Sequence, residues 1–199
     1  NISLPHIHAT SYDNTSCTIG VVHLGFGAFH RAHQAVYIDD YMSVTNDFRW
    51  GIAAVNLRES ESKHFENTAK EIKTNNGYLI KSYSSNGHDS LRLVRSHIDF
   101  YDWIKDQDIS QDLLALETVH LVTITVTESG YYTDANGKLD LNDSIIFDEI
   151  NNSNLKTVYG YLRNSLNKRA ISGGAPITIA CYDNIRQNGL MLKDNLITY

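Results

Sequence analysis

The stretch "VVHLGFGAFHRAHQAVYIDD", residues 21–40, decides the fold of this 199-residue chain. Its first part is apolar and β-branched and ends at Gly25, a pattern that is typical of a strand buried on both faces. From Ala28 onward, apolar and aromatic side chains recur at roughly helical spacing. We therefore predict a strand, a tight turn at residues 25–27 and a helix.

Three interpretations of that turn are open. In a dinucleotide-binding loop, Gly25 permits the tight turn, Gly27 lets the backbone approach a diphosphate, and the helix start offers free N–H groups to the anion. His30 stands where the third glycine of that fingerprint belongs, although Ala32 could make the close helix–sheet contact. An ordinary strand-to-helix turn would show the same residues. A metal site at His30 and His33 is the third interpretation, but no carboxylate or cysteine at matching spacing completes a ligand set, so we expect no metal.

Later segments repeat the alternation of strand and helix. Buried-strand patterns recur at residues 50–57, 119–127 and 175–182, and residues 155–174 are patterned as an amphipathic helix. This alternation predicts an α/β fold with a Rossmann-like, doubly wound and mainly parallel sheet. We expect one nucleotide-binding domain over residues 1–199, with residues 1–17 as an amino-terminal extension.

The part between the second and third buried strands departs from this alternation. Two β-rich runs, residues 76–84 and 89–98, are joined by a turn that contains Asn86-Gly87, which predicts an antiparallel hairpin excursion. Polar helical stretches are expected to follow, from about Asp99 to Leu116.

Composition excludes several classes of function. A net charge of −6 argues against a nucleic-acid partner, which would require a basic face. No apolar run approaches the roughly 20 residues that a membrane helix needs, so we expect no membrane partner. Cys17 and Cys181 lack the spacing of a disulfide framework or a zinc site, which indicates a reducing, cytoplasmic location. Asn1 in place of Met leads us to expect a processed or excised piece.

In an open parallel sheet, a ligand binds beyond the carboxyl ends of the strands. The tip of the second strand often carries an acid that accepts hydrogen bonds from the adenosine ribose, but here it carries Asn56 and, two residues later, Arg58. Asn56 would bind the ribose, and Arg58 would stack on adenine or meet a 2′-phosphate. NAD and NADP therefore both remain open at this position, and a solvated loop would also fit Arg58.

The tips of the last two strands also carry polar side chains. Glu128 and Tyr131 follow the third strand pattern and would lie near a nicotinamide, although a capping acid and a packing aromatic would give the same pattern. Asn184 and Asn188 follow the last strand, where carboxamides can donate to a developing alkoxide oxygen. Turn chemistry alone also favours asparagine at such places.

Taken together, these motifs resemble the mannitol dehydrogenase family. These are the polyol-specific long-chain dehydrogenases that include mannitol 2-dehydrogenase, fructuronate reductase (mannonate oxidoreductase) and tagaturonate reductase. The resemblance runs from about Thr18 to Tyr199 and corresponds to the amino-terminal half of the family's architecture. The matching pieces, in family order, are "VVHLGFGAFHRAHQAVYIDD", "WGIAAVNLR", "TITVTESGYY", "GYLRNSLNKR" and "ACYDNIRQNG".

The resemblance implies positions for cofactor and substrate. It implies NAD as the cofactor, with NADP not excluded, and a diphosphate lying against Gly27, Ala28 and Phe29. It places Glu128 and Tyr131 on the nicotinamide side of the cleft.

The family's D-N-x-x-x-N-G element matches residues 183–189. In the family an asparagine of this element helps to hold the reacting oxygen of the substrate, which implies that role for Asn184, with Asn188 as the second candidate.

One element of the family is missing from these residues. Family members take their general base, a lysine in a K-x-x-x-x-N-x-x-H pattern, from a mostly helical second domain. No such pattern occurs here, since Lys193 is followed five residues later by Thr198. Without the lysine, removal of the alcohol proton loses its catalyst. The resemblance therefore implies a carboxy-terminal helical domain as partner.

The sequence thus predicts the cofactor domain of an NAD-dependent oxidoreductase that interconverts a polyol or sugar acid with its keto form. The substrate would be fructuronate- or mannonate-like or mannitol- or fructose-like, and the stretch Val55–Arg58 favours the hexuronate class. The chain alone is expected to be inactive. The competing hypothesis is a non-catalytic dinucleotide-binding fragment or sensor module.

Overall fold

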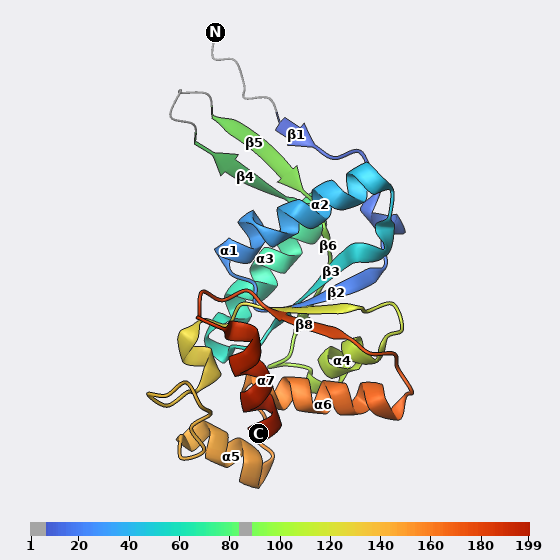
Figure 1. Cartoon of the computed structure of the whole chain (residues 1–199). Helices are drawn as coiled ribbons and strands as arrows, with labels where there is room; N and C mark the ends of the chain where they lie inside the picture. The colour runs from blue at the N-terminus through green and yellow to red at the C-terminus, as the bar shows by residue number, and fades with distance from the viewer. Residues whose placement is uncertain (1–6, 84–88) are drawn as a thin grey trace.

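The computed structural model describes residues 7–83 and 89–199 and has an α/β architecture. Its main sheet is wholly parallel, with β2 in the centre, β3 and then β6 on one side, and β7 and then β8 on the other (Figure 1). This order confirms the doubly wound sheet. The strands are β2 (Ile19–Leu24), β3 (Gly51–Asn56), β6 (His97–Asp102), β7 (Leu121–Ile124) and β8 (Thr178–Cys181).

Helices cover both faces of this sheet. Side chains alternate along β2, so that Val21 packs with Ala35 on one face, whereas Val22 and Leu24 join the core that contains Tyr161 on the other. In Figure 1, α1 to α3 lie above the sheet and α4, α6 and α7 lie below it. The helices are α1 (Ala28–Ala32), α2 (Gln34–Thr45), α3 (Ser62–Asn75), α4 (Gln107–Asp112), α5 (Ser144–Asn152), α6 (Val158–Ile171) and α7 (Asn188–Thr198).

Two local predictions need correction. The helix predicted from Ala28 is divided at His33, whose φ of −123° and ψ of −85° are not helical. Residues 99–102, predicted as helical, belong to β6, and the helix that follows begins only at Gln107. Because β6 is an edge strand with mostly half-buried positions, it carries polar residues that obscure the strand pattern.

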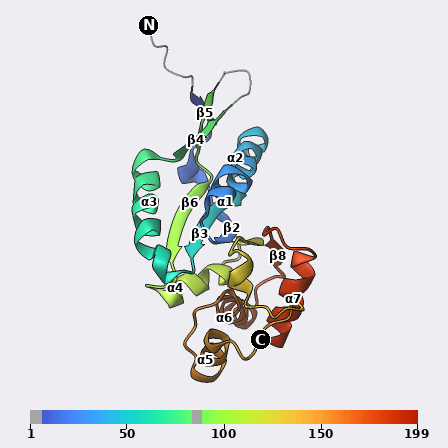
Figure 2. The same cartoon turned by 90° about the vertical axis from the view of Figure 1, so that its left-hand side faces the viewer.

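The predicted antiparallel hairpin is present as β4 (Tyr78–Ser82) and β5 (Ser90–Val94), and its turn at Asn86-Gly87 lies outside the described residues. A third strand, β1 (Ile7–Ala9), pairs in parallel with β5. Figures 1 and 2 show this small sheet at one end of the molecule and α5 at the opposite end. Residues 7–9 of the amino-terminal extension therefore belong to a second sheet.

A buried carboxylate joins the small sheet to the main fold. Asp39 of α2 is fully buried and accepts hydrogen bonds from the Tyr12 hydroxyl at 2.5 Å and the Arg95 backbone N–H at 3.1 Å. The Arg92 guanidinium pairs with it at 3.1 Å. Burial and the neighbouring carboxylate raise the pKa of Tyr12, so its hydroxyl stays protonated and keeps donating. These donors stabilise the charge of Asp39 and fix β5 against α2.

Three histidines lie buried between the sheet and the helix that follows β2. His23 of β2 and His30 of α1 stack with their ring centroids 3.3 Å apart, and His30 Nε2 lies 2.8 Å from Nε2 of His97 on β6. We call these three residues the histidine cluster. Burial lowers the pKa of His30 to about 3, and burial together with the neighbouring imidazoles lowers the pKa of His23 and His97 well below the usual value. The histidine cluster is therefore neutral near pH 7.

This neutrality predicts how stability depends on pH. Below pH 6.5 the unfolded chain binds protons on these histidines, whereas in the folded chain their lowered pKa values keep them unprotonated, so acid favours unfolding. We expect the free energy of unfolding, measured with urea, to fall by roughly 3 kcal/mol between pH 6 and pH 5, about 1 kcal/mol from each histidine. His97→Phe should lower this slope by about a third relative to His120→Phe, a substitution at an exposed position. Equal stability at the two pH values would contradict neutral burial.

Candidate functional site

A cleft of about 960 Å³ opens at the carboxyl ends of the parallel strands. Its walls come from the loops after β2, β3 and β7 and from residues 154–158, which lead into α6. The neighbouring strands β2 and β7 start connections that run in opposite directions, so the cleft lies at the point where the strand order reverses. Four of the predicted site residues line it, namely Gly25, Gly27, Asn56 and Arg58.

Gly25 occupies a position that only glycine can fill. Its φ is +106°, and a Cβ atom there would lie 2.3 Å from the carbonyl oxygen of Thr125 on the β7 side. Its N–H donates to the carbonyl of Val55 at 2.9 Å, which ties the end of β2 to β3. Gly25 therefore lets the chain turn while pressed between two neighbouring strands.

Gly27, unlike Gly25, has open space around it. Its φ is −73°, and a Cβ atom built there would meet no atom within 4 Å. The first hydrogen bond of α1 runs from Arg31 N–H to Gly27 O at 3.2 Å, so the N–H groups at Ala28 and Phe29 have no partner inside that helix. Gly27, Ala28 and Phe29 are exposed. The loop thus offers bare backbone and free donors to an approaching anion.

The ring of Phe26, the residue between the two glycines, packs against aromatic side chains of α3 and β6 and so holds the loop in place. Its ring makes edge contacts with Phe65 at 5.5 Å, with His97 at 5.2 Å and with Phe100 at 5.4 Å between centroids. The guanidinium of Arg31 lies over the same ring, 5.2 Å from its centroid. We did not anticipate this role, because these partners come from α3 and β6 and no local pattern connects them to the loop.

Asn56 and Arg58 form the β3 side of the cleft in different ways. The Asn56 carboxamide donates to Arg58 O and to Asp102 Oδ1, both at 2.9 Å, and accepts from Arg58 N–H at 3.1 Å. It therefore shapes the turn and has few hydrogen-bonding positions left for a ribose. The Arg58 guanidinium reaches the β7 side and donates to Val126 O at 2.6 Å and to Thr127 Oγ1 at 2.8 Å. Arg58 places a positive charge at the cleft wall.

The tip of β7 is strained at Thr127. This β-branched residue has a φ of +69° and a ψ of 162°, a conformation that costs about 1–3 kcal/mol. Its side chain accepts from Arg58, and its N–H donates to Asp183 Oδ1 at 3.2 Å. Bonds from two other strand tips thus hold Thr127 in place at the cleft wall.

Asp183 connects the tips of β7 and β8. Its carboxylate accepts from Val126 N–H at 2.9 Å, from Thr127 N–H and from the Tyr131 hydroxyl at 2.5 Å. Tyr131 is fully buried, and burial together with the hydrogen bond to Asp183 raises its pKa. Tyr131 does not line the cleft, so its side chain supports the strand tips from behind.

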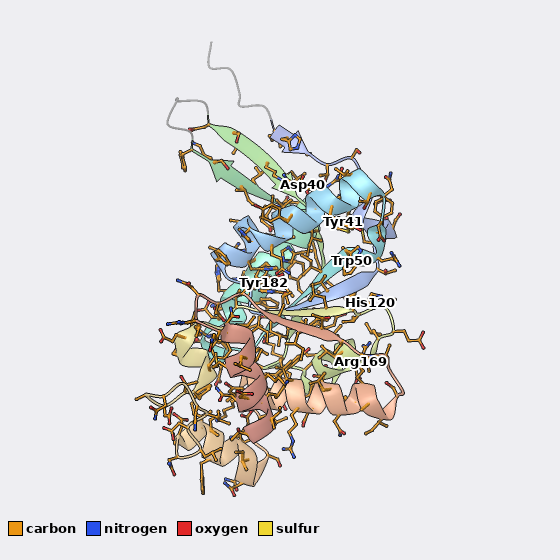
Figure 3. The ribbon with its side chains drawn as sticks, in the orientation of Figure 1. Asp40, Tyr41, Trp50, His120, Arg169 and Tyr182 are labelled. Carbon is orange, nitrogen blue, oxygen red and sulfur yellow. The ribbon has the colours of Figure 1, made fainter. Side chains whose placement is uncertain are left out.

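The two asparagines of the β8 loop have different environments. Asn188 Nδ2 donates to Cys181 O and to Asp183 O, both at 2.9 Å, and so closes the turn that leads into α7. Asn184 is exposed at the same tip, next to Tyr182, which is 43% exposed. Figure 3 shows Tyr182 on the side opposite to Trp50 and His120, which belong to the other ends of the strands. Of the two, Asn184 is free to contact a ligand.

Glu128 lies on a neighbouring surface. It begins a short 3₁₀ helix, Glu128–Tyr131, and faces a second hollow of about 890 Å³ that also carries Asp134, Asp140 and Asp143. Thr127 belongs to both hollows, so Glu128 lies next to the cleft without lining it.

His30 and His33 do not come together. His30 is buried in the histidine cluster, whereas His33 is exposed and stacks on Phe29 with centroids 5.0 Å apart. Within residues 7–83 and 89–199, no three histidine, cysteine or acidic side chains are grouped as metal ligands. Among the described residues there is also no helix of the length and hydrophobicity that would cross a membrane.

The role of Asp183 generates a prediction about stability. Asp183→Asn replaces an acceptor of three hydrogen bonds with a carboxamide whose N–H₂ would face either Thr127 N–H or both Val126 N–H and the Tyr131 hydroxyl. We expect urea denaturation to show a loss of roughly 2–3 kcal/mol, because bonds to a charged acceptor are lost. The matched control is Asp194→Asn at an exposed position of α7, which should change stability by less than about 0.5 kcal/mol. Equal effects of the two substitutions would contradict a supporting role for Asp183.

Comparison with known proteins agrees with this geometry. Residues 19–199 match the model of the mannitol dehydrogenase Rossmann domain. The chain is 30% identical over 188 residues to a mannitol 2-dehydrogenase from Cereibacter sphaeroides, covering 94% of this chain and 39% of that protein. It is 33% identical over 189 residues to D-mannonate oxidoreductase from Escherichia coli (strain K12), covering 92% and 37%. The chain thus spans about two fifths of the length of these relatives.

Solved structures show the same fold. Pseudomonas fluorescens mannitol 2-dehydrogenase, in a ternary complex with NAD and D-mannitol, superposes with a TM-score of 0.87 at 26% identity, covering 98% of this chain and 39% of that one. A substrate-free D-sorbitol dehydrogenase superposes with a TM-score of 0.84 at 28% identity, covering 96% and 39%. The family match covers residues 19–199, and the fold is that of the two solved relatives. The chain therefore belongs to the mannitol dehydrogenase family, of which it contains the Rossmann domain.

Proposed function

We propose that this chain is the cofactor-binding domain of an NAD-dependent oxidoreductase that interconverts a secondary alcohol of a polyol or sugar acid with the ketone. The observation that carries the proposal is the loop at Gly25 and Gly27, which presents bare backbone to a cleft at the reversal of the strand order. The similar mannitol 2-dehydrogenase that was solved with NAD and D-mannitol supports the same assignment.

The cofactor would lie along the strand tips. Its diphosphate would contact the backbone of Gly27, Ala28 and Phe29, where N–H groups are free. Its adenosine would lie on the β3 side near Arg58, whose charge would also suit a 2′-phosphate, so NADP is the alternative cofactor. Asn56 would act by shaping the turn at Arg58, since its carboxamide is already engaged there.

The reaction would take place near the tips of β7 and β8. NAD, when bound there, would supply the hydride acceptor. Asn184 would donate a hydrogen bond to the reacting oxygen of the substrate, with Asn188 holding that loop in place. Glu128 would lie on the nicotinamide side, with Tyr131 supporting it from beneath.

The rest of the active site would come from outside these residues. The lysine base would be supplied by a carboxy-terminal helical domain, and the working enzyme would be cytoplasmic. The relatives named for mannitol and for mannonate support a polyol or a hexuronic acid as substrate, and we favour the mannonate-like class. A non-catalytic dinucleotide-binding module is the second candidate, because the lysine pattern K-x-x-x-x-N-x-x-H does not occur in these residues.

Substitution of the two glycines tests the cofactor loop. Gly27→Ala adds a methyl group in open space, so the free energy of unfolding should change by less than about 1 kcal/mol, while NADH affinity, measured by fluorescence titration, should fall about tenfold. Gly25→Ala should instead destabilise the fold, because its Cβ would overlap the Thr125 carbonyl. Unchanged NADH affinity in folded Gly27→Ala would refute a diphosphate at this loop.

Turnover assays separate the enzyme from the binding module. The chain alone should bind NADH and show no oxidation of NADH with fructose or fructuronate. Addition of a carboxy-terminal helical domain, fused after Tyr199 from one of the relatives, should restore turnover. Robust turnover by the chain alone would contradict a base supplied from outside, and binding without turnover in the fusion would favour the non-catalytic module.

A further inference from the structure

The histidine cluster adjoins the cofactor loop directly at two points and through Thr125 at a third. His30 follows Phe29 directly in the chain, His97 packs against the ring of Phe26 at 5.2 Å, and His23 Nε2 lies 2.9 Å from Oγ1 of Thr125. The backbone of Thr125 is also the surface against which Gly25 is pressed. The loop therefore begins against Thr125, the hydrogen-bond partner of His23, and ends next to His30.

With the Gln34 carboxamide oriented as it is in the structure, the hydrogen bonds of the cluster have one consistent direction. Gln34 Oε1 is an acceptor and lies 2.9 Å from His30 Nδ1, so this nitrogen carries the proton. In a neutral imidazole the other nitrogen is then an acceptor, and His30 Nε2 must receive its hydrogen bond from Nε2 of His97 at 2.8 Å. His97 Nδ1 is left as an unprotonated nitrogen, and it is buried without a hydrogen-bond partner among the described residues.

The same reasoning fixes His23. The Thr123 hydroxyl donates its single proton to Gln34 Oε1 at 3.1 Å, so its oxygen accepts from His23 Nδ1 at 2.8 Å. His23 Nε2 is then the acceptor of the Thr125 hydroxyl. Gln34 is the common acceptor on which the His23 and His30 branches of the network converge. A change of tautomer at His30 or His97 would place two donors or two lone pairs face to face, and a change at His23 would require the Thr123 hydroxyl to turn away from Gln34 Oε1.

We propose that His30 and His97 are positioning residues for the dinucleotide, and that their directed hydrogen-bond network holds the loop from Gly25 to Phe29 in its binding conformation. This inference depends on the proposed cofactor site. The network acts on the loop through Phe26 and through the start of α1, and it does so without placing a charge beneath the diphosphate. His30, which stands where the third glycine of the dinucleotide fingerprint belongs, thus holds the loop in position.

Two substitutions at position 97 separate hydrogen bonding from packing. His97→Phe keeps an aromatic ring against Phe26 but removes the donor to His30 Nε2, so NADH affinity should fall about tenfold. His97→Gln restores an N–H donor and should recover affinity to within about threefold of the wild type. His120→Phe, the same change at an exposed position just before β7, should leave affinity unaltered.

Ring-nitrogen NMR of the wild-type chain tests the network without a substitution. We expect protonation at Nδ1 of His23 and His30 and at Nε2 of His97, with the His30 and His97 signals shifting when NADH is added. The opposite tautomers, or equal NADH affinity in folded His97→Phe and wild type, would overturn the inference. If the wild-type chain fails to bind NADH at all, the proposed function fails, and the ring-nitrogen signals still decide whether the network exists.

Discussion

The contact between Gly25 and the Thr125 carbonyl is the constraint on which the rest of the site depends. Two parallel strands, β2 and β7, end side by side, and the chain leaving β2 passes so close to β7 that a methyl group would overlap the backbone. This close approach directs residues 26–29 over the strand tips. It also leaves open space around Gly27, so the backbone of this turn lines the cleft.

Polar bonds between strand tips then hold the cleft in shape. Arg58 reaches from β3 to β7, and Asp183 reaches from β8 to the same backbone segment at residues 126–127. Because Thr127 has an unfavourable backbone conformation, these bonds are what keep it in place. The cleft wall is thus maintained by side chains from strands distant in sequence, and Asp39 does the same for the small sheet.

Sequence reasoning succeeded where the cause was local. The glycine loop, the βαβ unit and the hairpin follow from strand patterns and turn residues, and each is present. It failed at β6, an edge strand whose polar residues resemble an exposed helix. It also left the histidine at position 30 unexplained, since its partner His97 lies 67 residues away, and spacing contains no information about that contact.

Residue type predicted which side chains lie at the strand tips better than it predicted what each side chain does there. Asn56, Tyr131 and Asn188 are all at strand tips as expected, but their polar groups bond to the protein itself. Amide and hydroxyl groups suit a turn as well as they suit a ligand, so only the structure separates these uses. In contrast, Arg58 lines the cleft and Asn184 is exposed, so a ligand can still reach both side chains.

The most direct test of the account is amide chemical-shift mapping of this chain during titration with NADH. The account predicts that the largest shifts fall on Gly25, Gly27, Phe29, Arg58 and Thr127, with the three-stranded sheet unaffected. Largest shifts on β4 and β5, or an unchanged spectrum at millimolar NADH, would contradict a dinucleotide site at the ends of the parallel strands.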